Sequence, residues 1–138
     1  IAFARVSDEQ IFVRSQVYNP NVVIVLDPSI LRIVNVAQGM INGGILVANT
    51  HKNPEELASR YDLSLKVAVV DANRIAKEEL GRPITNTTML GAMLKATNIL
   101  PLESFYGPLK ARFGRIAERN IQALKRAYEE TQVLEPQH

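Results

Sequence analysis

Three polar residues follow short apolar runs of the sequence, and they are the first places to look for binding chemistry. Asp27, Asn49 and Asp71 each come directly after such a run. In an open parallel sheet, ligands gather beyond the carboxyl ends of the strands. For Asp27 and Asp71 a competing interpretation is favoured, because a carboxylate that precedes a helix caps its N-terminus. For Asn49 a role in a turn is favoured, and contact with a ligand is the alternative.

A polar triplet, Asn86-Thr87-Thr88, stands at the head of an apolar helical run that extends to Asn98. Two interpretations stay open. In the first, Asn86 or a neighbouring threonine caps the helix. In the second, the free N–H groups at the helix start, with the hydroxyls of Thr87 and Thr88, face an anion or a partner subunit. The same helix carries small residues that let another element approach closely: Gly91, Ala92 and Ala96.

Several kinds of chemistry are excluded by the residue types. The chain has no cysteine, so it cannot hold disulfides, thiolate nucleophiles or Cys-ligated zinc and iron–sulfur clusters. Its two histidines, His51 and His138, are too few and too scattered for a metal triad. The sequence also lacks the glycine-rich phosphate loops and the nucleophile elbow of hydrolases. No catalytic residue and no metal ligand is predicted.

The composition indicates a globular domain without an electrostatic partner preference. Of 138 residues, 46% are hydrophobic and 22% charged, which is enough for a real core. The formal net charge of +2 gives no basis for nucleic-acid binding. No apolar stretch reaches membrane-spanning length and the first residues do not resemble a signal peptide. We therefore expect a cytoplasmic protein.

Hydrophobic patterning predicts strands of two kinds. Alternating residues at Ile1–Val6 and Ile11–Val17 predict an antiparallel pair joined by a polar loop. Continuous apolar runs are typical of strands covered on both faces, and they occur at Val22–Leu26, Ile45–Ala48 and Val67–Val70. The strand starts are separated as in βαβ units, which predicts a parallel sheet.

Helical patterns separate and follow these strands. They cover Ser29–Gln38, Pro54–Tyr61 and Asn73–Leu80, and the last third of the chain is helical up to a frayed tail at Leu134–His138. The predicted fold is α/β: three layers, a mixed and mainly parallel sheet, an N-terminal antiparallel strand pair and a helical C-terminal third. We expect a single domain over residues 1–138.

An ordered set of segments resembles one known family. The strings NPNVVIVLDPSIL, INGGILVANT, VAVVDANRIAKEELGRPITNTTMLGAMLKATNILPLESF and NIQALKRAYEE occur in this order, as in the gamma subunit of the pyruvate and ketoisovalerate ferredoxin oxidoreductases. The opening AFARVSDEQIFVRSQV is also similar to the strand pair that follows the family's Gly-rich N-terminal part. That Gly-rich part has no counterpart here, so we expect that the chain lacks the beginning of a longer protein.

The resemblance implies a subunit of a thiamine-pyrophosphate enzyme. Such an enzyme oxidatively decarboxylates a 2-oxoacid, pyruvate by default, forms an acyl-CoA from CoA, and passes electrons through [4Fe-4S] clusters to ferredoxin. The cofactors, including Mg, would lie in the alpha, beta and delta partner subunits, and this chain would not be catalytic alone. Asn86 and Thr87 fall on a similar Asn-Thr pair of the family. With Asn49, they are candidates for contact with CoA or a neighbouring subunit.

One alternative class stays open at this point. The alternation of strands and helices would also suit a stand-alone flavodoxin-like module that binds a small ligand or transmits a signal. A phosphoacceptor version needs clustered carboxylates at the strand ends, and Asp27 with Asp71 is a sparse version of that cluster.

Overall fold

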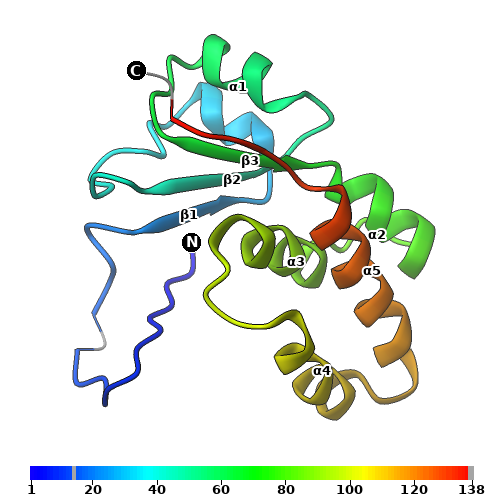
Figure 1. The fold of residues 1–138 in the computed structure, drawn as a ribbon. Helices are drawn as coiled ribbons and strands as arrows, with labels where there is room; N and C mark the ends of the chain where they lie inside the picture. Colours follow the sequence, from blue (N-terminus) through cyan, green and yellow to red (C-terminus); the bar gives the residue numbers. More distant parts are fainter. Residues whose placement is uncertain (14, 137–138) are drawn as a thin grey trace.

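A four-stranded mixed sheet forms the centre of the molecule (Figure 1). The computed structural model describes residues 1–13 and 15–136. Strands β1 (Val22–Val25), β2 (Ile45–Asn49) and β3 (Lys66–Val70) are parallel, and β4 (Gln132–Leu134) pairs antiparallel with β3. The order is β1-β2-β3-β4. The three continuous apolar runs therefore form the predicted parallel strands.

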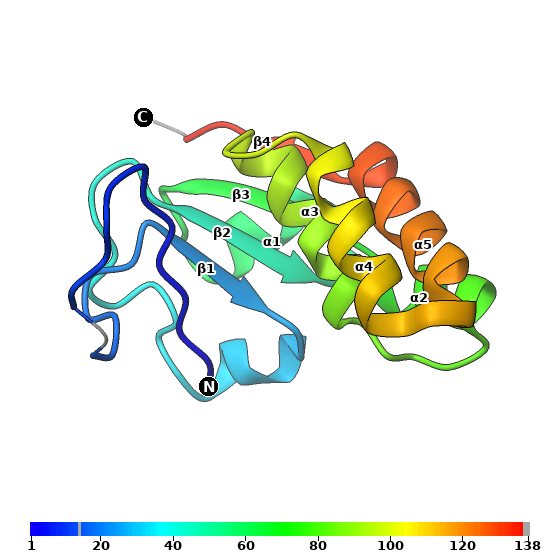
Figure 2. The ribbon, with the colours of Figure 1, turned by 90° about the horizontal axis from the view of Figure 1, so that it is seen from below.

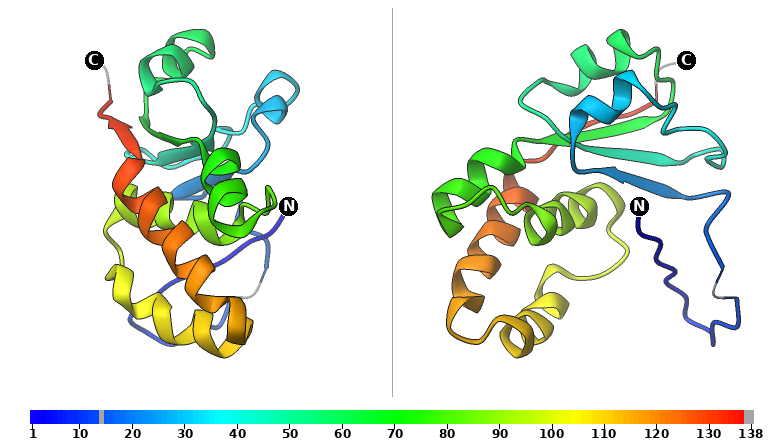
Figure 3. Two further views of the ribbon diagram at one scale, coloured as in Figure 1. Left: turned by 90° about the vertical axis from the view of Figure 1, so that its right-hand side faces the viewer. Right: turned by 180° about the vertical axis from the view of Figure 1, so that it is seen from behind.

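Helices cover both faces of this sheet and give the predicted three layers (Figure 3). The 3₁₀ helix η1 (Pro28–Arg32) and the helix α1 (Pro54–Arg60) pack on one face. On the other face lie α2 (Ala72–Leu80), α3 (Asn86–Thr97) and α5 (Ala117–Glu130). Between α3 and α5 the chain forms η2 (Leu102–Phe105), α4 (Tyr106–Phe113) and η3 (Gly114–Ile116).

Successive strand residues alternate between the two cores, as the two-residue period of a strand requires. Leu46 of β2 packs with Leu57 of α1, whereas the next residue, Val47, packs in the core that contains Met89 of α3. All four of these side chains are at most 2% exposed. Burial on both faces explains why the strands read as continuous apolar runs rather than as an alternating pattern.

Small residues bring α3 and α5 into close contact. Gly91 has no side chain, and a Cβ built there would collide with the backbone carbonyl of Leu124 and crowd Ala127. Neighbouring alanines of both helices are fully buried at this contact and against the sheet: Ala92, Ala96, Ala123 and Ala127. The small residues of α3 were expected to let another element approach closely, and that element is α5.

The predicted N-terminal antiparallel pair is wrong for the described residues. Residues 1–13 and 15–20 contain no strand. The two halves of this segment are joined by the Arg5 guanidinium, which donates to the carbonyls of Ser15 (3.5 Å) and Gln16 (3.2 Å). An isolated two-stranded hairpin is marginal in water, and nothing in the described chain covers its apolar side chains, so alternation alone does not produce a ladder.

Two helix and tail predictions also need correction. A helix was expected from Ser29 to Gln38, but the helical part ends at Arg32. The Asn35 side chain then accepts a hydrogen bond from the Ala37 N–H, and this local turn competes with a helix. Leu134, placed in the frayed tail, belongs to β4, because pairing with β3 extends the sheet. Gln137 and His138 lie outside the described residues.

Gly91→Ala tests the α3–α5 contact. We expect a loss of about 3 kcal/mol in the free energy of unfolding, because the added methyl group meets backbone and forces the helices apart. Urea denaturation followed by circular dichroism measures this. Gly107→Ala in α4 is the matched control, since a Cβ there meets nothing within 4 Å, and it should change stability by less than about 1 kcal/mol. Equal effects of the two substitutions would contradict the packing argument.

Candidate functional site

The side chain of Asn49 ties together three elements at the carboxyl edge of the sheet. Its Nδ2 group donates to the Leu26 carbonyl (2.9 Å) and to Asn73 Oδ1 (3.0 Å), and its Oδ1 accepts from the Ala72 N–H (3.0 Å). Asn49 is 2% exposed. Buried amides need such partners, so Asn49 joins the ends of β1 and β2 to the start of α2. This differs from the turn role favoured by the sequence, and it leaves one Oδ1 lone pair for any ligand.

The two carboxylates at this edge cap helices, as predicted. Asp27 accepts from the Ser29 N–H (3.0 Å) at the start of η1, and Asp71 accepts from the Arg74 N–H (3.2 Å) at the start of α2. The backbone hydrogen bond from Ser29 lowers the pKa of Asp27. Both groups thus have local structural partners.

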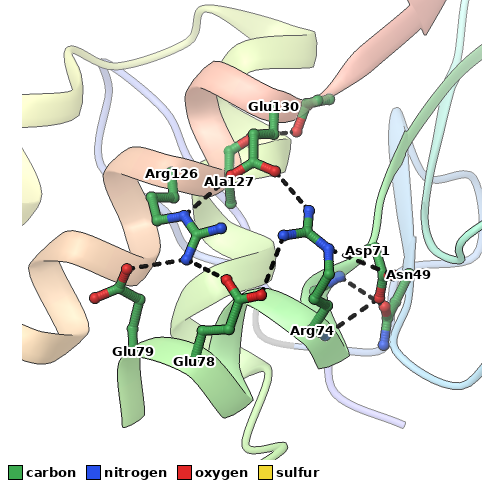
Figure 4. A network of polar contacts seen from close by, with 10 residues as sticks. Asn49, Asp71, Arg74, Glu78, Glu79, Arg126, Ala127 and Glu130 are labelled. Carbon is green, nitrogen blue, oxygen red and sulfur yellow. Dashed lines mark hydrogen bonds and ion pairs between the residues drawn. The ribbon is translucent and has the colours of Figure 1, made fainter.

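A network of ion pairs joins α2 to α5 beside this edge (Figure 4). Arg126 contacts Glu78 (2.7 Å), Glu79 (3.0 Å) and Glu130 (3.0 Å). Arg74 contacts Glu130 (2.6 Å) and lies 3.5 Å from Glu78. The network was not predictable from the sequence, because Arg74 and Glu130 are 56 positions apart and the charges of α5 resemble an ordinary solvated face.

The pKa values of the network shift in the direction that favours the ion pairs. A hydrogen bond from Arg126 lowers the pKa of Glu78, although desolvation opposes the shift. For Glu130, burial would raise the pKa, but hydrogen bonds from Arg74 and Arg126 outweigh it and the pKa is lowered. Hydrogen bonds to Glu78 and Glu79 raise the pKa of Arg126. The network therefore keeps its charges at neutral pH.

A hollow of about 240 Å³ lies at the carboxyl end of β3, next to the network. Its polar lining comes from Thr50, His51, Lys52, Asp71, Arg74, Glu130 and Gln132. Lys52 and Arg74 are opposed there by two carboxylates, so the hollow has no excess of positive charge for an anion. A second hollow of about 360 Å³ lies against Tyr128 and the loop Asn98–Glu103.

The polar triplet at the start of α3 is not a side-chain cap. Thr85 occupies the N-cap position and makes no side-chain capping hydrogen bond, while Asn86 is the first helical residue. Helical bonding begins with the Met89 N–H donating to the Thr85 carbonyl (2.9 Å), so the N–H groups of residues 86–88 have no intrahelical acceptor. The capping interpretation is therefore wrong.

The three side chains of the triplet differ in their access to solvent. Asn86 is exposed, Thr87 is 8% exposed and Thr88 is fully buried. The Thr88 hydroxyl has no hydrogen-bond partner among the described residues. In that part of the chain, no hydrogen bond joins Asn49 to Asn86 or Thr87, so the three candidates do not form one bonded cluster. Their contact with CoA or a subunit stays a prediction.

Residues 1–13 and 15–136 contain neither a candidate metal centre nor a candidate membrane span. No group of three or more His, Cys, Asp or Glu side chains in these ranges is arranged to hold a metal ion. Over the same ranges, none of the helices is both long and apolar enough to cross a bilayer.

Comparison with known proteins gives a match along almost the whole chain. Residues 1–130 match the family model of pyruvate ferredoxin/flavodoxin oxidoreductase. The common gamma subunit of the pyruvate/ketoisovalerate oxidoreductases of Pyrococcus furiosus is 44% identical over 136 residues, which are 97% of this chain and 74% of the relative. Pyruvate synthase subunit PorC of Thermotoga maritima is 40% identical over 139 residues, 97% of this chain and 72% of the relative.

A solved structure supports the same relationship. The crystal structure of pyruvate oxidoreductase subunit PORC of Thermotoga maritima superposes with a TM-score of 0.79 at 38% sequence identity. The superposition covers 86% of this chain and 67% of that one. The expectation that a Gly-rich segment belongs before residue 1 is not tested by these matches and stays a prediction.

Asn49→Ala tests the hydrogen bonds that join the ends of β1 and β2 to the start of α2. We expect a loss of about 2–4 kcal/mol in the free energy of unfolding, because the Ala72 N–H and the Leu26 carbonyl lose their partner at a buried position. Urea denaturation measures the loss. Asn86→Ala, at an exposed position, is the control and should stay within about 0.5 kcal/mol of the parent chain. A small effect of Asn49→Ala would show that water replaces the amide.

Arg126→Gln tests the ion network through the pH dependence of stability. Glu78 and Glu130 have folded pKa values below 4.5, so their stabilising contribution is present above that pH and is lost as the pH falls through the folded values. The variant should be less stable than the parent at about pH 7, and the difference should shrink below about pH 4. Arg115→Gln, an exposed position on η3, is the control. A pH-independent difference would contradict the electrostatic account.

Proposed function

The chain belongs to the pyruvate ferredoxin/flavodoxin oxidoreductase family, and we propose that it is the gamma subunit of a cytoplasmic 2-oxoacid:ferredoxin oxidoreductase. The observation that carries this proposal is the match over residues 1–130 together with more than 40% identity to a named gamma subunit. The stand-alone flavodoxin-like alternative is not favoured, because the carboxylates that it would use, Asp27 and Asp71, both cap helices.

The proposed reaction of the whole assembly is an oxidative decarboxylation. The bond between the carboxylate and the 2-oxo carbon breaks, CO₂ leaves, and the acyl group forms a thioester with the sulfur of CoA. With pyruvate as the default substrate, two electrons pass singly to two ferredoxin molecules and the thiol proton is released. Thiamine pyrophosphate supplies the electron sink for this step when bound.

The reactive groups of this assembly are assigned to other subunits. Thiolate ligands for [4Fe-4S] clusters cannot come from these 138 residues, because they include no cysteine. We assign the clusters, thiamine pyrophosphate and Mg to the alpha, beta and delta subunits. The role of this chain is then structural: it completes the assembly beside the CoA site and is not catalytic alone.

The start of α3 is the part of this chain that we assign to CoA or to a neighbouring subunit. Three N–H groups there have no intrahelical acceptor, and a helix N-terminus attracts phosphate oxygens. Asn86 is exposed and reaches a ligand directly, whereas Thr87 is mostly buried and offers chiefly its backbone N–H. Asn49 is a weaker candidate for contact with CoA or a subunit, since its amide already makes three hydrogen bonds within the chain.

Co-purification with the alpha, beta and delta subunits tests the proposed function. We expect a complex that oxidises a 2-oxoacid only when CoA is present, measured by ferredoxin reduction with pyruvate, 2-oxoglutarate, 2-ketoisovalerate and oxalate. A complex without this chain should lose that activity. Failure of this chain to join any such complex would contradict the assignment.

Within that complex, the double variant Asn86→Ala/Thr87→Ala tests the role of the α3 start. Loss of a phosphate contact should raise KM for CoA about tenfold and leave KM for the 2-oxoacid unchanged. Weaker assembly with normal CoA kinetics would instead identify a subunit contact. Asn42→Ala, on the exposed loop before β2, is the control. Unchanged assembly together with unchanged CoA kinetics would show that the start of α3 contacts neither CoA nor a neighbouring subunit.

A further inference from the structure

The turn between α4 and α5 carries a concentration of positive charge. Figure 1 shows α4 at the end of the molecule away from the sheet, and Figure 2, seen from that end, shows α4 in front of α3 and α5. Residues 110–119 hold four cations and one carboxylate, a net charge of +3, whereas the rest of the chain holds twelve cations and thirteen carboxylates, a net charge of −1. We call the four cations, all exposed, and the exposed isoleucine among them the basic tip: Lys110, Arg112, Arg115, Ile116 and Arg119.

No ion pair among the described residues neutralises the cations of the basic tip. The one carboxylate of this stretch, Glu118, accepts a hydrogen bond from the Gln122 amide (3.1 Å). The other end of α5 is the opposite case, since Arg126 pairs there with three carboxylates. The charge of the basic tip is therefore available to a partner.

The stability of the chain does not explain two of these cations. Lys110 and Arg112 lie in the last turn of α4, where the helix dipole favours positive charge. Arg115 and Arg119 stand at the start of α5, where the dipole of that helix opposes positive charge. They are also four residues apart, a spacing at which like charges on a helix repel each other. Their placement destabilises the isolated chain, and an anionic group on a partner would offset that effect.

The backbone of the basic tip is held in one conformation. Gly114 ends α4 with φ 53° and ψ −117°, a combination that residues with a side chain rarely adopt. The buried side chain of Asn120 donates to the Ile116 carbonyl (3.0 Å) and joins η3 to α5. Leu109 of α4 and Ile121 of α5 are buried in the same apolar cluster. A surface that is ordered before binding loses little conformational entropy when a partner covers it.

We propose that the basic tip binds an acidic surface on a neighbouring subunit of the complex, with Arg115 and Arg119 facing carboxylates of that subunit. This inference rests on the proposed function, because the partner is one of the other subunits. Arginine is enriched at protein interfaces and binds carboxylates through two parallel hydrogen bonds. Ile116, which is 52% exposed between the two arginines in sequence, supplies the apolar contact that the centre of such an interface needs. The N-terminal segment lies apart from the α4–α5 turn in Figures 1 and 2.

Co-expression with the alpha, beta and delta subunits, one of them tagged, tests this contact. The double variant Arg115→Glu/Arg119→Glu should reduce the recovery of this chain with the tagged subunit at least about tenfold, because the reversed charges repel the carboxylates of the partner. Arg115→Lys/Arg119→Lys keeps both charges and should be recovered like the parent chain. Arg60→Glu/Lys77→Glu reverses two exposed cations elsewhere and is the matched control. Circular dichroism of each isolated variant checks that it folds.

Carbodiimide crosslinking of the complex that contains Arg115→Lys/Arg119→Lys identifies the partner. The reagent joins a lysine amine directly to an adjacent carboxylate as an amide and takes up the water that is lost. We expect crosslinks from positions 115 and 119 to aspartate or glutamate residues of another subunit, read by mass spectrometry of the digested complex.

The outcomes separate this inference from the proposed function. Full recovery of Arg115→Glu/Arg119→Glu in a complex that the parent chain joins would overturn the inference and leave the proposed function standing. An equal loss of the Arg60→Glu/Lys77→Glu chain, or crosslinks confined to this chain, would also overturn the inference alone. A parent chain that joins no complex would overturn both.

Discussion

The contact between α3 and α5 at Gly91 determines where much of the remaining structure can lie. With no side chain at Gly91, the backbone of α5 approaches α3 directly, and buried alanines complete the contact. This position of α5 brings Arg126 and Glu130 to α2, and it delivers the chain that follows α5 to the edge of β3 as strand β4. The lack of a side chain at Gly91 therefore permits the α3–α5 contact, and the ion network and the pairing of β4 with β3 depend on that contact.

The carboxyl edge of the sheet shows how polar residues can serve structure at a position where ligands commonly bind. Asn49 makes three hydrogen bonds inside the molecule, and Asp27 and Asp71 each accept one from a helix N-terminus. Buried polar groups are stable only with such partners. By contrast, the N-terminal N–H groups of α3 receive no side-chain cap. The unsatisfied donors are thus at the helix that carries the polar triplet, and the strand ends are satisfied locally.

The elements that depend on local sequence pattern were predicted correctly. The three apolar runs gave three parallel strands, and helices at Pro54 and after Asp71 began within a residue of the expected positions. Interactions distant in sequence were not predictable: the Arg74–Glu130 pair and the role of Asn49 both depend on tertiary packing. The predicted N-terminal strand pair was wrong for the same reason. Alternation of apolar and polar residues suits a β-ladder, but a stable ladder also needs its apolar face buried against another surface, and the described residues provide no such surface. At Asn86, a cap-like sequence did not fix which residue takes the N-cap position.

The distribution of burial indicates what kind of protein this is. Over the described residues, β2 and β3 are closed on both faces by the chain's own helices, whereas β1 pairs only with β2 and its Ile24 stays 38% exposed. Apolar surface that stays in contact with water costs about 25 cal/mol for each Å² that could be buried, so the exposed Ile24 and Leu26 favour a covering element over β1, from the same polypeptide or from another. Among the described residues, the backbone donors at the start of α3 are therefore the polar groups that still need an acceptor, whereas the polar side chains at the strand ends already have theirs.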